Sequence, residues 1–295
     1  MCNKITYEEI FAMLCLSLLI YNYNENNKFI FKINQTLLDF YNNIDYSFDI
    51  YQREALSYLK DIIPNGKMLK FIDNVETDIQ LGIIENDIKK SLAIVFRGTD
   101  AYQDWLYDCT FCKTKLDDDV RVHSGFYNHL MSVYDEIIEV IDEFLIKDYN
   151  IYICGHSLGG GESLILSYLL SKKTSNLIKV ITFGAPKVGN YYWKQKYESI
   201  TNVIHYRITN KTDIITKLPI NYYHVGINIH IYEDKMIINN DEYIIFHNIF
   251  DHLITSYYNN FYGKKILYDN LIINNIRDSD SDISSDSENE NYCTC

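Results

Sequence analysis

A serine lies among closely spaced glycines near the middle of this 295-residue chain, in Gly155-His156-Ser157-Leu158-Gly159. The preceding segment, 149–154, is apolar enough for a buried strand, and 162–170 has apolar residues at helical spacing. A strand, a tight turn and a helix are the setting in which G-x-S-x-G lifts a serine hydroxyl above the end of a sheet. Glycines are expected at such a turn because side chains there would collide with the adjoining strand and helix. Ser157 is therefore the candidate nucleophile.

Apolar segments on both sides of this turn alternate between strand and helix patterns. Strands are expected at 76–84, 91–96, 180–183 and 203–208, with a hairpin over 226–246 that turns at 233–235. Helices are expected at 5–21, 55–63, 128–147 and 247–261. This alternation predicts an α/β fold with a mainly parallel central sheet and helices on both faces. We expect one domain over residues 1–274; within it, most of 22–80 has no clear assignment.

The charge of the chain is acidic and unevenly spread. The net charge of −13 argues against a nucleic-acid partner. Six acidic residues and no Lys or Arg lie in 278–295. We therefore expect residues 275–295 to be an acidic, disordered tail.

The cysteines and the N-terminal segment indicate in which cellular compartment the protein is located. The seven cysteines are odd in number, and several lie in apolar runs, which favours a reducing environment over a disulfide framework. The apolar run 10–20 follows Glu8 and Glu9, unlike a signal peptide, and is too short to cross a bilayer. We interpret it as a helix packed on the body of the protein and expect an intracellular location.

A serine nucleophile needs a histidine to accept its proton and an acid to orient that histidine. Asp213 follows the expected strand 203–208, at the end of the sheet where sites of such folds lie, although a helix cap or loop acid would look the same. His252 is the candidate base. Further histidines after Ser157 are His205, His224, His230 and His247. Chain order counts against His205, which precedes Asp213, whereas the spacing does not exclude His247.

Six ordered segments together resemble the class 3, fungal-type lipases. They are Phe96-Arg97-Gly98-Thr99, Val122-His123-Ser124-Gly125-Phe126, Gly155 to Gly160, Thr182 to Asn190, Asp213 with Leu218-Pro219, and Asp251-His252-Leu253 with Tyr257 two residues later than the family's tyrosine. The resemblance covers roughly residues 90–260.

This resemblance implies an α/β-hydrolase fold and a serine lipase or esterase that acts on a lipid ester such as an acylglycerol or phospholipid. It implies that Ser157 is the nucleophile, Asp213 the orienting acid and His252 the general base. The oxyanion donors would be the amide of Leu158 and the amide and hydroxyl of Thr99. Transient contact with a lipid surface is implied, and no cofactor or metal.

The segment after Thr99 is where the family carries a lid. Tyr102, Trp105 and Leu106 would supply its apolar face, although an ordinary loop fits the sequence equally well. Cys109 and Cys112 form a C-x-x-C pair, which Cys293 and Cys295 could complete as a metal site. We favour no ligand role for these cysteines.

Two alternatives to ester hydrolysis stay open at this point. One is a lipase-like scaffold that binds a partner or lipid without catalysis, because a fold does not fix a function. The other is transfer of the acyl group to an alcohol in place of water.

Overall fold

An eight-stranded sheet with the strand order β1-β2-β3-β6-β7-β8-β9-β10 forms the centre of the protein. The computed structural model describes residues 4–21, 31–43, 48–99, 112–238 and 248–273. The strands are β1 (Lys67–Asn74), β2 (Ile79–Asn86), β3 (Ser91–Phe96), β6 (Asn150–His156), β7 (Ile178–Phe183), β8 (Val203–Asn210), β9 (Ile227–Ile231) and β10 (Met236–Ile238). Strands β3, β6, β7, β8 and β9 are parallel, and antiparallel strands extend both edges. The mainly parallel sheet expected from the sequence is confirmed.

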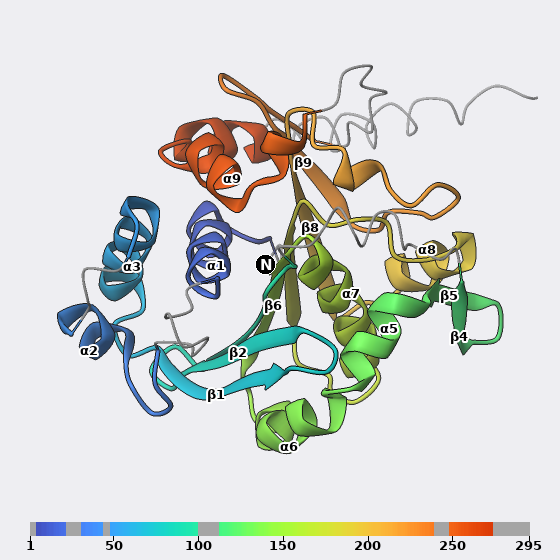
Figure 1. Ribbon diagram of the computed structural model, residues 1–295, viewed down its shortest axis with the longest axis horizontal. Coiled ribbons are helices and arrows are strands. Elements are labelled where there is room, and N and C mark those ends of the chain that lie inside the picture. Colours follow the sequence, from blue (N-terminus) through green and yellow to red (C-terminus); the bar gives the residue numbers. More distant parts are fainter. Residues whose placement is uncertain (1–3, 22–30, 44–47, 100–111, 239–247, 274–295) are drawn as a thin grey trace, which may run out of the picture.

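Helices cover both faces of this sheet (Figure 1). On one face lie α1 (Tyr7–Leu19), α3 (Ile50–Ile62) and α9 (Ile254–Phe261), with α2 (Leu37–Asn42) beside α3. On the other lie α5 (Ser124–Met131), α6 (Tyr134–Leu145), α7 (Leu158–Ser171) and α8 (Tyr191–Glu198), next to the hairpin of β4 (Lys113–Asp117) and β5 (Val120–His123). Alternate residues of β3 enter two separate hydrophobic clusters, Ala93 and Val95 one of them and Leu92 and Ile94 the other. The sheet therefore has an apolar core on each face.

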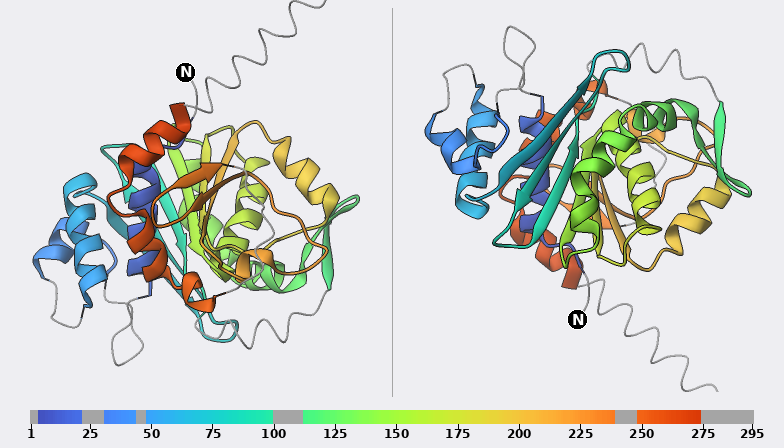
Figure 2. Two further views of the ribbon diagram at one scale, coloured as in Figure 1. Left: turned by 90° about the horizontal axis from the view of Figure 1, so that it is seen from above. Right: turned by 90° about the horizontal axis from the view of Figure 1, so that it is seen from below.

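Helix α1 is buried around almost its whole circumference. It lies between the sheet and α3 (Figure 2), and its residues from Ile10 to Leu19 are all buried. Thr6 and Glu9 form a capping box that satisfies backbone N–H groups at its start. The interpretation of the apolar run 10–20 as a helix packed on the body is confirmed.

The single helix expected over 128–147 is wrong, because two helices share this segment. The segment holds the end of α5 and all of α6, with a break at Ser132 and Val133. Leu130, Val133 and Ile137 are all buried in one cluster. The apolar spacing therefore continues through the break, and periodicity alone could not detect it.

The C-terminal part differs in a similar way. The hairpin of β9 and β10 confirms the turn at 233–235, while residues 239–247 lie outside the described part. The expected helix 247–261 is a 3-10 turn, η2 (Ile249–His252), followed by α9, because Leu253 leaves the helical conformation at ψ 137°. The break places His252 at the end of a turn and not within a helix.

The unassigned region 22–80 contributes whole elements of the fold. It contains α2, the antiparallel edge strand β1 and the first residues of β2, and α3 begins five residues before the expected helix 55–63. The tail expected at 275–295 lies outside the described residues, so the division of the chain at residue 274 stays a prediction.

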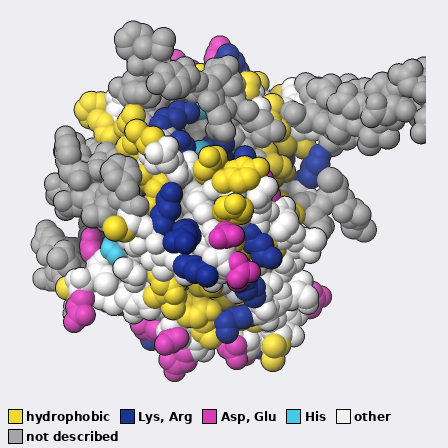
Figure 3. Space-filling view, turned by 90° about the vertical axis from the view of Figure 1, so that its right-hand side faces the viewer, with side chains coloured by type: hydrophobic (Ala, Val, Ile, Leu, Met, Phe, Trp, Pro, Cys, Tyr) yellow, Lys and Arg dark blue, Asp and Glu magenta, His cyan; other side chains and the backbone are white. Residues whose placement is uncertain are grey.

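The surface carries mixed charge on the face where β4, β5 and α8 lie, at the right of Figure 1. Figure 3 shows Lys and Arg side chains gathered there, with acidic and hydrophobic side chains around them. The net negative charge of the sequence is therefore not spread evenly over the surface. Within the described ranges, no helix combines the length and apolar composition needed to cross a bilayer.

Helix α7 contains one buried acid, Glu162. Its carboxylate lies 3.4 Å from His129 Nδ1 on α5, and its side chain is 1% exposed. Burial raises the pKa of Glu162 to about 7, and the proximity of Glu162 raises the pKa of His129. Both groups bind a proton more tightly in the folded chain than in the unfolded one. Stability is therefore lost as the pH rises, between about 4.5 and 7 for Glu162 and above about 6.5 for His129.

We predict that Glu162→Gln removes most of this pH dependence. The free energy of unfolding of the parent chain should fall by on the order of 2 kcal/mol between about pH 5 and pH 8, measured by urea denaturation. The Glu162→Gln variant should lose no more than about a third of that amount. Glu139→Gln, the same change at an exposed position of α6, is the control and should leave the slope intact. Equal slopes in the parent and the Glu162→Gln variant would contradict the assignment.

Candidate active site

Ser157 stands on a strained turn between β6 and α7. Its backbone has φ 56° and ψ −125°, a conformation that non-glycine residues rarely adopt. The Ser157 N–H donates to the Phe183 carbonyl at 2.9 Å, which ties the turn to the end of β7. The strand, turn and helix expected around the G-x-S-x-G pattern are confirmed.

The glycines of the motif let three pieces of backbone meet. A Cβ on Gly155 would lie 2.4 Å from backbone atoms of Gly159, and a Cβ on Gly159 would lie 2.6 Å from the Arg97 carbonyl oxygen. These neighbours are backbone, so they cannot move aside as a side chain could. The motif therefore needs glycine at both positions for steric reasons.

Three side chains from distant parts of the chain meet at this turn. His252 Nε2 lies 2.8 Å from Ser157 Oγ, and His252 Nδ1 lies 2.9 Å from Asp213 Oδ2. All three residues are buried, with exposures of 2–3%. A carboxylate can only accept, so with neutral His252 the proton sits on Nδ1 and Nε2 accepts the serine O–H. This is the geometry in which a histidine can remove a serine proton.

Further hydrogen bonds hold Asp213 in place. Tyr257 donates its hydroxyl to Oδ2 at 2.6 Å, and the Ile215 N–H donates to Oδ1 at 2.9 Å. Burial and the nearby Asp213 raise the pKa of Tyr257 well above its usual value, so the phenol stays protonated and remains a donor. The Asn210 N–H donates to the Tyr257 oxygen at 3.2 Å. Tyr257, found two residues late in the sequence motif, still reaches the acid.

The other candidate bases in the described part of the chain have partners other than Ser157. His205 faces Thr182 at 3.0 Å, His230 faces Thr209 at 2.7 Å, and His224 Nε2 lies 2.6 Å from the Thr216 carbonyl. His247 lies outside the described residues. The structure therefore brings together the three residues that the sequence analysis selected.

Tyr21 and His156 join the site although the sequence analysis gave them no role. His156 Nε2 lies 2.7 Å from the His252 carbonyl, and Tyr21 Oη lies 2.8 Å from His156 Nδ1. Burial lowers the pKa of His156 well below its usual value, so the ring is neutral. Because a carbonyl only accepts, His156 Nε2 carries the proton, and Tyr21 must donate to Nδ1. The signal was absent from the local sequence because Tyr21 and His156 lie 135 positions apart.

Tyr21 also reaches the strand end that carries Thr99. The Gly98 N–H donates to Tyr21 Oη at 3.0 Å. A Cβ on Gly98 would lie 2.7 Å from the His156 carbonyl oxygen and 3.1 Å from Ser157 Cβ. Glycine at this position therefore allows the Phe96–Thr99 segment to pass directly beside the serine.

A pocket of about 300 Å³ opens onto the site. Thr99, His156 and His252 line it together with Leu18, Tyr21, Asp49, Gln52, Leu253, Ile254 and Thr255. Leu158 supplies the first amide of α7, and amides in the first turn of a helix have no acceptor within the helix. Thr99 and Leu158 thus lie where oxyanion donors are expected, and their role stays a prediction.

The other site residues considered in the sequence analysis are those of the lid and the cysteines. Tyr102, Trp105 and Leu106, expected in a lid, lie outside the described residues, as do Cys109, Cys293 and Cys295. Cys112 is exposed and has a free thiol. Over the described ranges, no group of three or more His, Cys, Asp or Glu side chains is placed to hold a metal ion.

Comparison with known proteins agrees with this geometry. The family model described as "Lipase (class 3)" matches residues 93–223. The lipase of Rhizopus niveus is 28% identical over 165 residues, which cover 53% of this chain and 42% of that protein. The lipase of Rhizomucor miehei is 28% identical over 187 residues, which cover 56% and 51%. The chain therefore spans about half the length of these relatives or less.

Solved structures show the same fold. The crystal structure of a lipase from Rhizopus microsporus var. chinensis has a TM-score of 0.68 at 23% identity and covers 84% of this chain and 85% of that one. The Rhizomucor miehei triacylglyceride lipase has a TM-score of 0.67 at 22% identity and covers 83% and 92%. The fold is that of an α/β-hydrolase, with a Ser–His–Asp arrangement at the carboxyl ends of its strands. The part of the chain that resembles the class 3 lipases in sequence is therefore residues 93–223, which hold Ser157 and Asp213.

We predict that Tyr21→Phe destabilises the protein by about 1–2 kcal/mol. The substitution leaves the Gly98 N–H and His156 Nδ1 without the hydroxyl that serves both. Urea unfolding measures the change. Tyr58→Phe, on the neighbouring helix α3, is the matched control and should change the free energy of unfolding by less than about 0.5 kcal/mol. Equal effects of the two substitutions would show that the Tyr21 hydroxyl does not stabilise the site.

Proposed function

We propose that the protein is a serine lipase or esterase that hydrolyses a carboxylic ester of a lipid through an acyl-enzyme on Ser157. The observation that carries the proposal is the buried line of hydrogen bonds from Asp213 through His252 to Ser157. The match of residues 93–223 to the class 3 lipase family supports it. In this proposal Ser157 is the nucleophile, His252 the general base and Asp213 the orienting acid.

Acylation begins when Ser157 Oγ attacks the ester carbonyl carbon and His252 Nε2 takes the serine proton. Asp213 stays ionised and stabilises the resulting imidazolium through its hydrogen bond to Nδ1. The negative charge on the former carbonyl oxygen is accepted by the amides of Leu158 and Thr99 and by the Thr99 hydroxyl. Each such donor typically stabilises the transition state by about 3 kcal/mol.

Collapse of this intermediate breaks the ester bond. His252 returns the proton from Nε2 to the departing alcohol oxygen, and the acyl group remains on Ser157. Water then attacks the acyl-enzyme with His252 again as the base, which releases a carboxylic acid and regenerates the serine. No cofactor is required for either step.

The apolar side of the pocket supports a lipid-like substrate. Leu18, Leu253 and Ile254 line the pocket beside the catalytic side chains. A neighbouring structure is described as a triacylglycerol lipase with a serine protease triad, and a relative from Penicillium cyclopium as a secreted mono- and diacylglycerol lipase. An acylglycerol is therefore the first substrate to test, and a phospholipid the second.

Two further parts of the proposal concern access and location. The first is transient contact with a lipid surface; Tyr102, Trp105 and Leu106, expected in a lid from the sequence, lie outside the described residues. An intracellular site of action accords with the free, buried thiols of Cys15 and Cys154. The relatives lend this location no support, because the Penicillium cyclopium protein is named as secreted.

We predict that Ser157→Ala lowers kcat/KM for p-nitrophenyl butyrate by at least about 10⁴-fold without unfolding the protein. The reason is that no other group can form the acyl-enzyme. Ser163→Ala, the same change six residues later in α7, removes a hydrogen bond to the Gly159 carbonyl and should keep activity within about tenfold. Hydrolysis that is undetectable in the parent protein or unchanged in the Ser157→Ala variant would overturn the proposal and favour a binding scaffold.

A further inference from the structure

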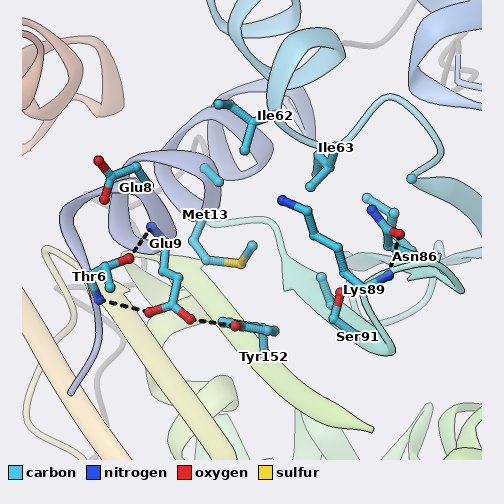
Figure 4. Close-up of a pocket in the computed structure, with 14 residues that line it drawn as sticks. Thr6, Glu8, Glu9, Met13, Ile62, Ile63, Asn86, Lys89, Ser91 and Tyr152 are labelled. Carbon is cyan, nitrogen blue, oxygen red and sulfur yellow. Dashed lines mark hydrogen bonds between the residues drawn. The ribbon is translucent and has the colours of Figure 1, made fainter. Parts of the chain in front are cut away.

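A second pocket, of about 290 Å³, lies at the amino ends of β3 and β6, whereas Ser157 follows the carboxyl end of β6. Figure 4 shows the lining residues of this pocket. The start of α1, the end of α3 and the first residues of β3 and β6 line it. Tyr152 on β6 lies in this pocket, and at about 3.3 Å per strand residue it is ~16 Å from Ser157. The two pockets share no lining residue, so this cavity is not an extension of the active site.

Most of the pocket wall is aliphatic. The apolar lining residues are Ala12, Met13, Ile62, Ile63, Ile84 and Ala93. At about 30 Å³ for each water-sized group, the volume holds about ten non-hydrogen atoms. Apolar pockets with a few polar groups are the usual binding sites for small organic ligands. The cavity therefore fits a short aliphatic chain with a small head group.

The acids at the pocket already have partners. Glu9 Oε1 accepts from Lys179 Nζ at 2.5 Å and from the Tyr152 hydroxyl at 2.6 Å, and Glu9 Oε2 accepts from the Thr6 N–H at 2.7 Å. Glu8 pairs with Lys265. Both carboxylates are thus neutralised by lysines outside the pocket lining, and neither calls for a cationic ligand.

Besides Glu8 and Glu9, the charged residue that lines the pocket is Lys89. Its side chain extends over the apolar wall, with the ammonium nitrogen toward Ile62 and Ile63 at the end of α3 (Figure 4). Of the carboxylates in the described part of the chain, none forms an ion pair with it. A cation beside apolar side chains is best satisfied by an anion that brings its own apolar portion.

We infer that this pocket binds a medium-chain fatty-acid anion, with its carboxylate at Lys89 and its chain against Met13, Ile84 and Ala93. Octanoate, with about ten non-hydrogen atoms, matches the volume. The choice of a fatty acid rests on the proposed function, because ester hydrolysis at Ser157 releases that class of product. Binding in this pocket does not itself require catalysis.

Helix α1 joins the two pockets physically. Its start, from Thr6 to Met13, lines the fatty-acid pocket, while Leu18 at its end and Tyr21 just beyond line the active-site pocket. A bound fatty acid therefore packs on the helix that leads to the Tyr21 hydroxyl beside Gly98 and His156.

The test is a titration of protein carrying ¹³C-methyl methionine with sodium octanoate, followed by NMR. We expect a saturable shift of the Met13 methyl signal, with Met131 and Met236 as reporters outside the pocket. Lys89→Glu should raise the dissociation constant for octanoate at least tenfold, because it places a carboxylate where the head group binds. Lys90→Glu makes the same change in net charge at the next residue, which lies over the Tyr149 ring outside the pocket, and should leave binding within threefold.

Absence of a saturable Met13 shift would overturn the inference. So would equal binding by the Lys89→Glu variant and the parent, or equal binding of 1-octanol, which has the chain without the charge. Because the Met13 signal does not depend on turnover, failure of this site and failure of the proposed hydrolase activity give separate results. A Met13 shift in a protein without esterase activity would support the pocket and refute the catalytic proposal.

Discussion

The close approach of three backbone segments at Ser157 is the constraint on which the site depends. Strand β6, helix α7 and the end of β3 meet there because Gly155, Gly159 and Gly98 have no side chains to separate them. The contact holds Ser157 at φ 56°, a conformation that the surrounding structure must stabilise. In return, the hydroxyl stands clear of the sheet, beside the first amide of α7 and the backbone that leads to Thr99.

The other catalytic candidates reach this point from the carboxyl ends of later elements. Asp213 follows β8, and His252 ends a 3-10 turn that precedes α9. Gly184, at φ 60° after β7, leaves room for them, since a Cβ there would lie 2.9 Å from Asp213 Oδ2 and 3.1 Å from His252 Cε1. Tyr257 then holds Asp213 from α9. The parallel sheet thus gathers at one edge residues that are far apart in sequence, as expected for ligand sites in such folds.

Much of this could be predicted from the sequence, for identifiable reasons. The turn at Ser157 has a local glycine pattern, and Asp213 and His252 follow it in the expected chain order, so short motifs were sufficient to select them. His252 could not be separated from His247 until its ring was placed against Ser157. No local sequence pattern marked Tyr21 as part of the site, because its partners Gly98 and His156 are distant in the chain. The break between α5 and α6 was missed because both helices bury one continuous apolar stripe.

The measurement that tests the account most directly is covalent labelling of the folded protein with an alkyl fluorophosphonate, followed by peptide mass spectrometry. The account predicts one adduct, on Ser157, because His252 and Asp213 activate that hydroxyl, and predicts that prior unfolding in urea or His252→Ala prevents it. The chain's other serines lack this arrangement of base and acid among the described residues. A folded protein that forms no adduct, or forms one at a different serine, would contradict the assignment of the buried Asp213–His252–Ser157 line as the catalytic centre.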